Sequence, residues 1–127
     1  MKRKLSFFLV ALTFLLASVA GAAQPEAFKV QTAKALLDLC TAPPDSPLHR
    51  EAIHFCHGFL VGALAYHMAE NAGPEGKALV CFPDPAPTRN EAINMFVDWL
   101  KAHPELMNDR PVETEFRFLI EKWPCKP

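Results

Sequence analysis

Cys56 is the first residue to consider for catalysis or metal binding, because His54 and His57 flank it. A cysteine beside a histidine can act as a nucleophile, and thiolate and imidazole groups together bind zinc. However, residues one or two positions apart on a helix do not face each other, so neither histidine is placed to activate the sulfur. The two histidines lie one turn apart, but no third and fourth metal ligand follow at a recognisable spacing. We therefore interpret Cys56 as half of a disulfide and predict no metal and no cofactor.

The other polar residues also lack a catalytic arrangement. The sequence has no Gly-rich phosphate loop, no nucleophile elbow and no HExxH zinc motif. His67 and His103 fall on apolar helix faces, which is typical of core histidines with satisfied hydrogen bonds. Three glutamates near the carboxyl terminus are interpreted as a solvated helix surface: Glu113, Glu115 and Glu121. Arg117 follows the first of them by one turn and is expected to pair with it. We predict no catalytic residue, and therefore a protein that is not an enzyme.

An export signal is predicted at the amino terminus. Residues 2–4 are basic, the run over 5–17 is almost entirely apolar, and small residues follow. Cleavage is expected after Ala20, Ala22 or Ala23. The apolar run is short for a membrane span, although its retention as an uncleaved anchor stays open. The sequence therefore predicts a periplasmic protein.

The expected domain organisation is a signal peptide over 1–23 and one domain over 24–127, a length typical of a single domain. The whole chain has 13 basic and 14 acidic residues, and cleavage removes three basic ones. The mature chain is therefore acidic. This charge argues against nucleic acid and an anionic membrane surface as partners, and no stable membrane insertion is expected after cleavage.

The stretch over 53–67 is apolar nearly all round, which predicts a helix in the middle of a bundle with neighbours on more than one side. It contains Gly58 and Gly62, one turn apart. Each glycine costs roughly 1 kcal/mol relative to alanine in a helix, so we expect another helix to approach closely here. The alternative is that both glycines are tolerated by chance.

Four helices are predicted, over residues 32–40, 46–70, 88–103 and 111–123. Ser46 and Pro47 resemble an N-cap followed by proline at the first helical position. Thr88 and Glu91 form a capping box at the start of the third helix. The proline-rich segment over 73–87 is expected to be an irregular loop held by Cys81.

The last helix shows an apolar stripe with helical spacing: Val112, Phe116, Leu119, Ile120 and Trp123. We expect this stripe to face the core. Phe118 falls on the opposite side, where it marks either an interface or a single exposed apolar residue.

All four cysteines lie in the mature chain: Cys40, Cys56, Cys81 and Cys125. An even number in an exported chain predicts two disulfides, and the sequence by itself allows three pairings. Short connections favour antiparallel neighbouring helices, an arrangement that pairs Cys40 with Cys56 and Cys81 with Cys125. The predicted fold class is an all-α, small four-helix bundle stapled by two disulfides.

Five short motifs occur in a characteristic order: Leu36-Leu-Asp-Leu-Cys40, Cys56-His-Gly-Phe-Leu-Val-Gly62, Cys81-Phe-Pro83 before Thr88, Trp99-Leu-Lys-Ala-His-Pro-Glu105 and Trp123-Pro-Cys125. In these motifs the chain resembles the Rap1a/Tai family of periplasmic immunity proteins, which neutralise cell-wall amidases delivered by type VI secretion. It departs from the family in a segment one residue longer between Cys81 and Thr88, and in Glu91 where glutamine is frequent.

The resemblance implies an HdeA-like helical fold, a possible homodimer, and inhibition of a peptidoglycan amidase effector of the NlpC/P60 cysteine hydrolase type. The contacts are expected on the outer face of the 88–103 helix and the turn after it. These candidate partner-binding residues are Asn90, Asn94, Asp98, Lys101, His103, Glu105 and Asn108. The alternative function is that of an HdeA-like acid-stress periplasmic chaperone, or a binding protein without a cognate toxin.

Overall fold

The computed structural model describes residues 25–126, so the predicted signal peptide lies outside the described residues. The elements are η1 (Pro25–Lys29), α1 (Ala33–Cys40), α2 (His49–Glu70), α3 (Arg89–Lys101), η2 (Pro104–Leu106) and α4 (Pro111–Lys122). The β-structure in residues 25–126 is limited to one isolated bridge between Val80 and Pro124. The predicted all-α class with four helices is therefore confirmed.

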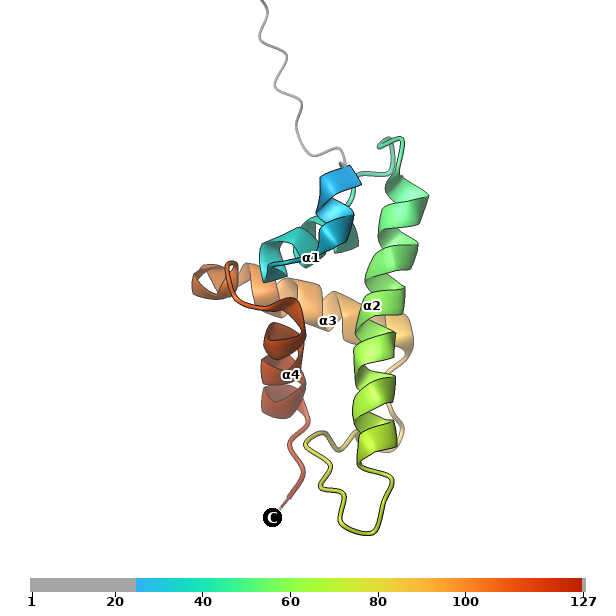
Figure 1. Ribbon diagram of the computed structural model, residues 1–127, viewed down its shortest axis with the longest axis vertical. Helices are drawn as coiled ribbons and strands as arrows, with labels where there is room; N and C mark the ends of the chain where they lie inside the picture. The colour runs from blue at the N-terminus through green and yellow to red at the C-terminus, as the bar shows by residue number, and fades with distance from the viewer. Residues whose placement is uncertain (1–24, 127) are drawn as a thin grey trace, which may run out of the picture.

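Each of the four α-helices contacts the other three. In Figure 1, α2 and α4 stand upright on either side, α3 passes across both of them, and α1 lies above it. The arrangement is thus a crossed one rather than a set of parallel rods. The core lies where the four helices meet, and its largest fully buried side chains are Phe96, Leu36, Leu39 and Leu100.

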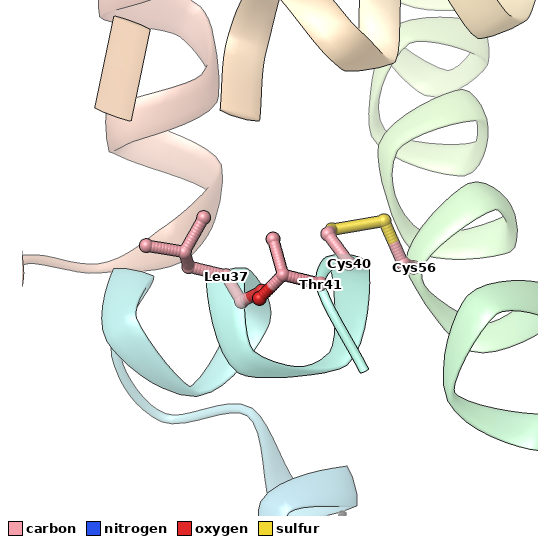
Figure 2. The surroundings of a disulfide bond; sticks show 4 residues. All are labelled: Leu37, Cys40, Thr41 and Cys56. Atoms are coloured by element: carbon pink, nitrogen blue, oxygen red, sulfur yellow. A yellow bond between two sulfur atoms is a disulfide. The ribbon is translucent and has the colours of Figure 1, made fainter. Parts of the chain in front are cut away.

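Both predicted disulfides are confirmed. Cys40 at the end of α1 is bonded to Cys56 in α2, with 5.1 Å between their Cα atoms (Figure 2). Beside it, the Thr41 hydroxyl and main-chain N–H both donate to the Leu37 carbonyl and close α1. The second bond, Cys81–Cys125, ties the long loop to the end of the chain.

The start of α2 differs from the prediction. The helix begins at His49, and Ser46 caps nothing. The Ser46 carbonyl accepts a hydrogen bond from the His49 N–H, while the Ser46 N–H donates to the Pro43 carbonyl. Residues 43–49 therefore form successive tight turns, which use the backbone groups that a helix starting at Ser46 would need. The capping box at Thr88 and the first-turn proline of α4 are confirmed.

The prediction that another helix approaches α2 closely at Gly58 and Gly62 is wrong, although α2 does contact α1, α3 and α4. The buried residues of α2 are Ala52, Cys56 and Leu60, all toward the amino-terminal end and on one face. Gly58 and Gly62 are exposed, and a Cβ atom on either would meet nothing within 4 Å. No helix approaches the glycine strip, because α2 lies at the edge of the arrangement (Figure 1).

By length and composition alone, α2 would also qualify as a membrane-crossing helix. Core helices of soluble proteins pass the same test, and the buried face of α2 packs into the helical core. The carboxyl-terminal half of the helix nevertheless exposes apolar groups, with Tyr66 66% exposed and Met68 also open to solvent.

The buried face of α4 also differs from the predicted stripe. Val112 and Ile120 are 44% and 38% exposed, whereas Leu119 is buried as expected. Phe118, which was expected on the outer side, is 3% exposed and packs its ring against those of Phe96, Trp99 and Trp123.

The residues that α4 buries include two polar ones, Thr114 and Glu115. The expectation that Glu115 belongs to a solvated surface is therefore wrong, although the Glu113–Arg117 ion pair is confirmed at 2.7 Å. The physical reason is that contact with α1, α2 and α3 turns the row containing Thr114 and Phe118 inward. The apolar side chains at 112 and 120 are left outside.

Candidate partner-binding surface

The outer face of α3 carries four of the candidate residues. The residues exposed along it are Asn90, Glu91, Asn94, Met95, Asp98 and Lys101. The opposite face is buried in the core through Ile93, Phe96, Val97 and Leu100. Because one face is fixed by packing, the other is held in a defined orientation, which lowers the entropic cost of binding a partner.

The amino-terminal end of α3 is fixed by hydrogen bonds. The Thr88 N–H donates to Glu91 Oε2 at 2.7 Å, and the Glu91 N–H donates to the Thr88 hydroxyl oxygen at 3.3 Å. The hydrogen bond from the Thr88 hydroxyl to the carboxylate, followed by the one from its backbone, lowers the pKa of Glu91. Glu91 is thus an ionised carboxylate held in place at this end of the surface, close in sequence to the exposed Arg89.

The turn after α3 is built around His103. Its Nδ1 donates to the Trp99 carbonyl at 2.7 Å, and its ring lies 4.2 Å from the Trp99 ring. Since Trp99 Nε1 donates in turn to Glu121 in α4, His103 takes part in holding the turn against the helices. Glu105 and Asn108 are exposed beyond it. The structure thus places His103 in a packing role and leaves the other two at the surface.

The charged groups of this surface are available to a partner. Neither Asp98 nor Lys101 makes an ion pair with any residue from 25 to 126. Polar and charged side chains of this kind typically form the rim of an interface, around a less polar centre. Met95 supplies an exposed apolar group on the same face, and the sequence interpretation did not single it out.

The Cys56 cluster has no catalytic geometry. Cys56 is buried and its sulfur is committed to the disulfide. Burial, followed by the charges of Arg89 and His54, lowers the pKa of His57, so it is neutral near pH 7. Within residues 25–126, no group of three or more His, Cys, Asp or Glu side chains could hold a metal ion.

His67 is the satisfied histidine that the sequence predicted. Its Nε2 accepts a hydrogen bond from the Leu79 N–H at 3.2 Å, and its Nδ1 lies 3.1 Å from the Asn71 amide nitrogen. The ring packs edge-on against Phe116. This histidine links α2 to the loop and to α4, so its role in the described structure is structural.

The sequence interpretation assigned one buried carboxyl group to the surface. Glu115 is 3% exposed and lines an apolar cavity between α2, α3 and α4. Charged residues normally lie outside, so grouping Glu115 with the exposed Glu113 and Glu121 concealed that it is buried. A signal was present in Phe118, since a large aromatic near the same face as Glu115 argues that this face is covered.

The family model for Rap1a immunity proteins matches residues 32–125. The chain belongs to this family. The match begins at Thr32, which caps α1, and ends at Cys125, so it takes in all four helices and both disulfides. Searches of curated proteins and of solved structures gave no match. All seven candidate residues of this Rap1a-family chain lie within the matched region.

Proposed function

We propose that this Rap1a-family protein is exported to the periplasm, binds a peptidoglycan amidase effector of type VI secretion and blocks its active-site cleft. The observation that carries the proposal is the family match over all four helices. Immunity proteins act by binding rather than by catalysis, and residues 25–126 contain no metal-binding group and no free cysteine.

The export part of the proposal is supported by two separate features. The sequence begins with a basic segment, an apolar run and small residues, as secretory signals do. Both cysteine pairs form disulfides, which persist in oxidising compartments such as the bacterial periplasm. This is also the compartment in which peptidoglycan is found.

The inhibitory surface that we propose is the outer face of α3, extended by the turn to Asn108. Asn90 and Asn94 offer both donors and acceptors, while Asp98 and Lys101 present charges of opposite sign one turn apart. A rigid helix bearing such groups can enter a groove and exclude substrate from it. The proposed partner is an amidase of the NlpC/P60 cysteine hydrolase type.

The test is a binding and inhibition assay with the mature protein. Candidate amidases from the same genome are purified, and binding and muropeptide release are measured. A cognate pair is expected to bind at nanomolar levels, about −12 kcal/mol, and to stop hydrolysis at an equimolar ratio. If no amidase of that genome binds, the immunity function is wrong for this chain, whatever its family.

A second function, that of an acid-stress chaperone, is favoured by the exposed apolar residues on and after α2. Tyr66, Met68 and Leu79 are all largely open to solvent. Chaperone activity would appear as protection of an aggregating client protein that rises below about pH 6, where free histidines become charged. Protection without amidase binding would favour this second function over the first.

A further inference from the structure

A cavity of about 220 Å³, partly open to solvent beside Ala86 and Arg89, lies between α2, α3, α4 and the loop before α3. Its walls are apolar: Leu60 and Leu64 come from α2, Phe82 from the loop, Ile93 from α3 and Leu119 from α4. An apolar cavity of about 150 Å³ is known to accommodate benzene, so this one has room for a ring of that size and a small head group.

Glu115 is one of the residues that line this cavity. The residue is 3% exposed, and its Oε2 makes no hydrogen bond with any described residue. A buried polar atom without a partner is destabilising, so a rotation of the side chain that turns this atom toward a hydrogen-bonding group of a bound ligand recovers that loss. The cavity thus combines an apolar volume with one unused hydrogen-bonding group.

The charges around Glu115 decide which kind of head group fits. Burial raises the pKa of Glu115 to about 8, so the carboxyl group is protonated and neutral at pH 7. The other charged residue that lines the cavity is Arg89, which is exposed at the start of α3. The cavity walls from α2 and the 82–87 loop contain no titratable group. A neutral acid donates one hydrogen bond and accepts others, so it matches a neutral head group that does both.

A single water molecule would not find enough hydrogen-bonding partners beside Glu115. Buried waters typically make about three hydrogen bonds, and the buried polar group that the cavity walls offer is the one carboxyl of Glu115. A cationic amine is also a poor match, because bringing a charge into an apolar cavity requires both it and the carboxylate to be desolvated. A primary amide pairs with a protonated carboxyl through two hydrogen bonds and introduces no charge.

We propose that this cavity is a binding site for a small neutral molecule with a compact apolar body and one carboxamide or hydroxyl head group, which hydrogen-bonds to Glu115. The site is separate from the exposed face of α3, although Ile93 and Phe96 form part of its wall. The proposal therefore stands or falls independently of the amidase partner.

The test uses the mature protein with three probes that share a benzene ring: benzamide, toluene and benzylamine. Binding is followed at pH 6.5 by titration with heteronuclear NMR, which shows whether the amides of lining residues shift. Benzamide is expected to bind at least about tenfold more tightly than toluene, since two net hydrogen bonds give that much discrimination. The affinity for benzamide is expected to fall above about pH 8, because a carboxylate cannot donate a hydrogen bond to the amide carbonyl.

Two variants of Glu115 and one control variant make the test specific. Glu115→Gln keeps a neutral group that donates and accepts, so benzamide binding should persist without the pH dependence. Glu115→Met should abolish the preference for benzamide over toluene, while the exposed carboxylate variant Glu113→Gln should change neither property. Circular dichroism establishes that each variant is folded.

Three results would overturn the proposal. The first is an absence of shifts at the lining residues with millimolar probe. The second is equal affinity for toluene and benzamide in the wild-type protein. The third is a preference for benzylamine that grows with pH, which would mean that the site binds cations through an ionised Glu115.

Discussion

The helices α2 and α4 stand on opposite sides of the molecule in Figure 1 and bury unlike faces. α2 is the longest helix, yet only three of its residues are buried, and all three are small or medium-sized. Its exposed residues include glycine, alanine, tyrosine and methionine. α4 is shorter and richer in charged residues, but it buries residues in every turn, including Thr114 and Glu115. The more polar helix is therefore the more deeply embedded one.

This difference teaches that contacts with neighbours decide burial in a domain of this size. α4 is enclosed because α3 crosses it and the Cys81–Cys125 bond holds its end. α2 is held mainly by its amino-terminal half, through Cys56 and the core residues beside it, and further along by His67, while its glycine face meets no other helix. The apolar residues left over on α2 have no neighbour to pack against.

The largest expected effect distinguishes the two faces of α4. Phe118→Ala removes a ring that contacts three other aromatic rings and should cost about 3–5 kcal/mol of unfolding free energy. Ile120→Ala, at a partly exposed position, is the matched control and should cost less than about 1 kcal/mol. Urea denaturation measures both. Similar losses in the two variants would show that α4 is turned differently from the structure described.

The next effect concerns how α2 is held. The double variant Cys40→Ser, Cys56→Ser removes the disulfide, which joins residues 16 positions apart. This should lower the free energy of unfolding by about 3 kcal/mol. Hydrogen exchange should accelerate along α2 more than along α4, because α2 has fewer buried residues to hold it. Equal acceleration in both helices would contradict the idea that α2 depends on its amino-terminal attachment.

Glu115 gives an effect that depends on pH. Its pKa in the folded protein is about 8 against an ordinary value of 4.5, so between these values the unfolded chain loses a proton that the folded chain keeps. Stability should therefore fall as pH rises through this window, by up to about 1.4 kcal/mol per pH unit. Chemical denaturation at pH 5, 6, 7 and 8 should show the fall in the wild type and in Glu113→Gln. A much flatter profile is expected in Glu115→Gln, and parallel profiles would mean that Glu115 is not buried.

The smallest effect tests the open face of α2. Gly62→Ala should raise stability by roughly 1 kcal/mol, because alanine favours a helix and no neighbour obstructs its Cβ atom. Gly76→Ala is the contrasting control, since its Cβ atom would clash with the Asn71 backbone and should destabilise the loop. Thermal melts measure both changes. A destabilised Gly62→Ala protein would reveal a packing partner on this face.

Much of the fold could be predicted from local sequence signals. The capping box at Thr88, the first-turn proline of α4 and the even number of cysteines each have a local physical cause, and these three were confirmed. The helix start predicted from Ser46 and Pro47 was not, because α2 begins at His49. Burial could not be read in the same way, because it depends on which neighbours surround a helix. Two glycines that were expected in a helix contact, Gly58 and Gly62, are exposed to solvent. Glu115, which was expected at the surface, is buried.

Sequence periodicity predicted the exposure of some candidate residues, whereas their role in binding stays a prediction. Asn90, Asn94, Asp98 and Lys101 share one face by helical periodicity alone, and all four are exposed. Spacing also placed His103 on the apolar face of the helix, and its ring packs against Trp99, but spacing does not show which groups it contacts. The cavity beside Glu115 arises where three helices and a loop meet, so it has no local sequence signal.

The most direct test of the proposed function is a titration of the cognate amidase with wild-type protein and with the double variant Asp98→Lys, Lys101→Glu. Both charges are exposed and make no ion pair with a described residue, so their reversal should leave the melting temperature unchanged. We expect the wild type to stop muropeptide release at an equimolar ratio and the variant to bind at least about tenfold more weakly, a loss of about 1.4 kcal/mol or more. Full inhibition by a folded variant with undiminished affinity would contradict the assignment of the partner surface to the outer face of α3.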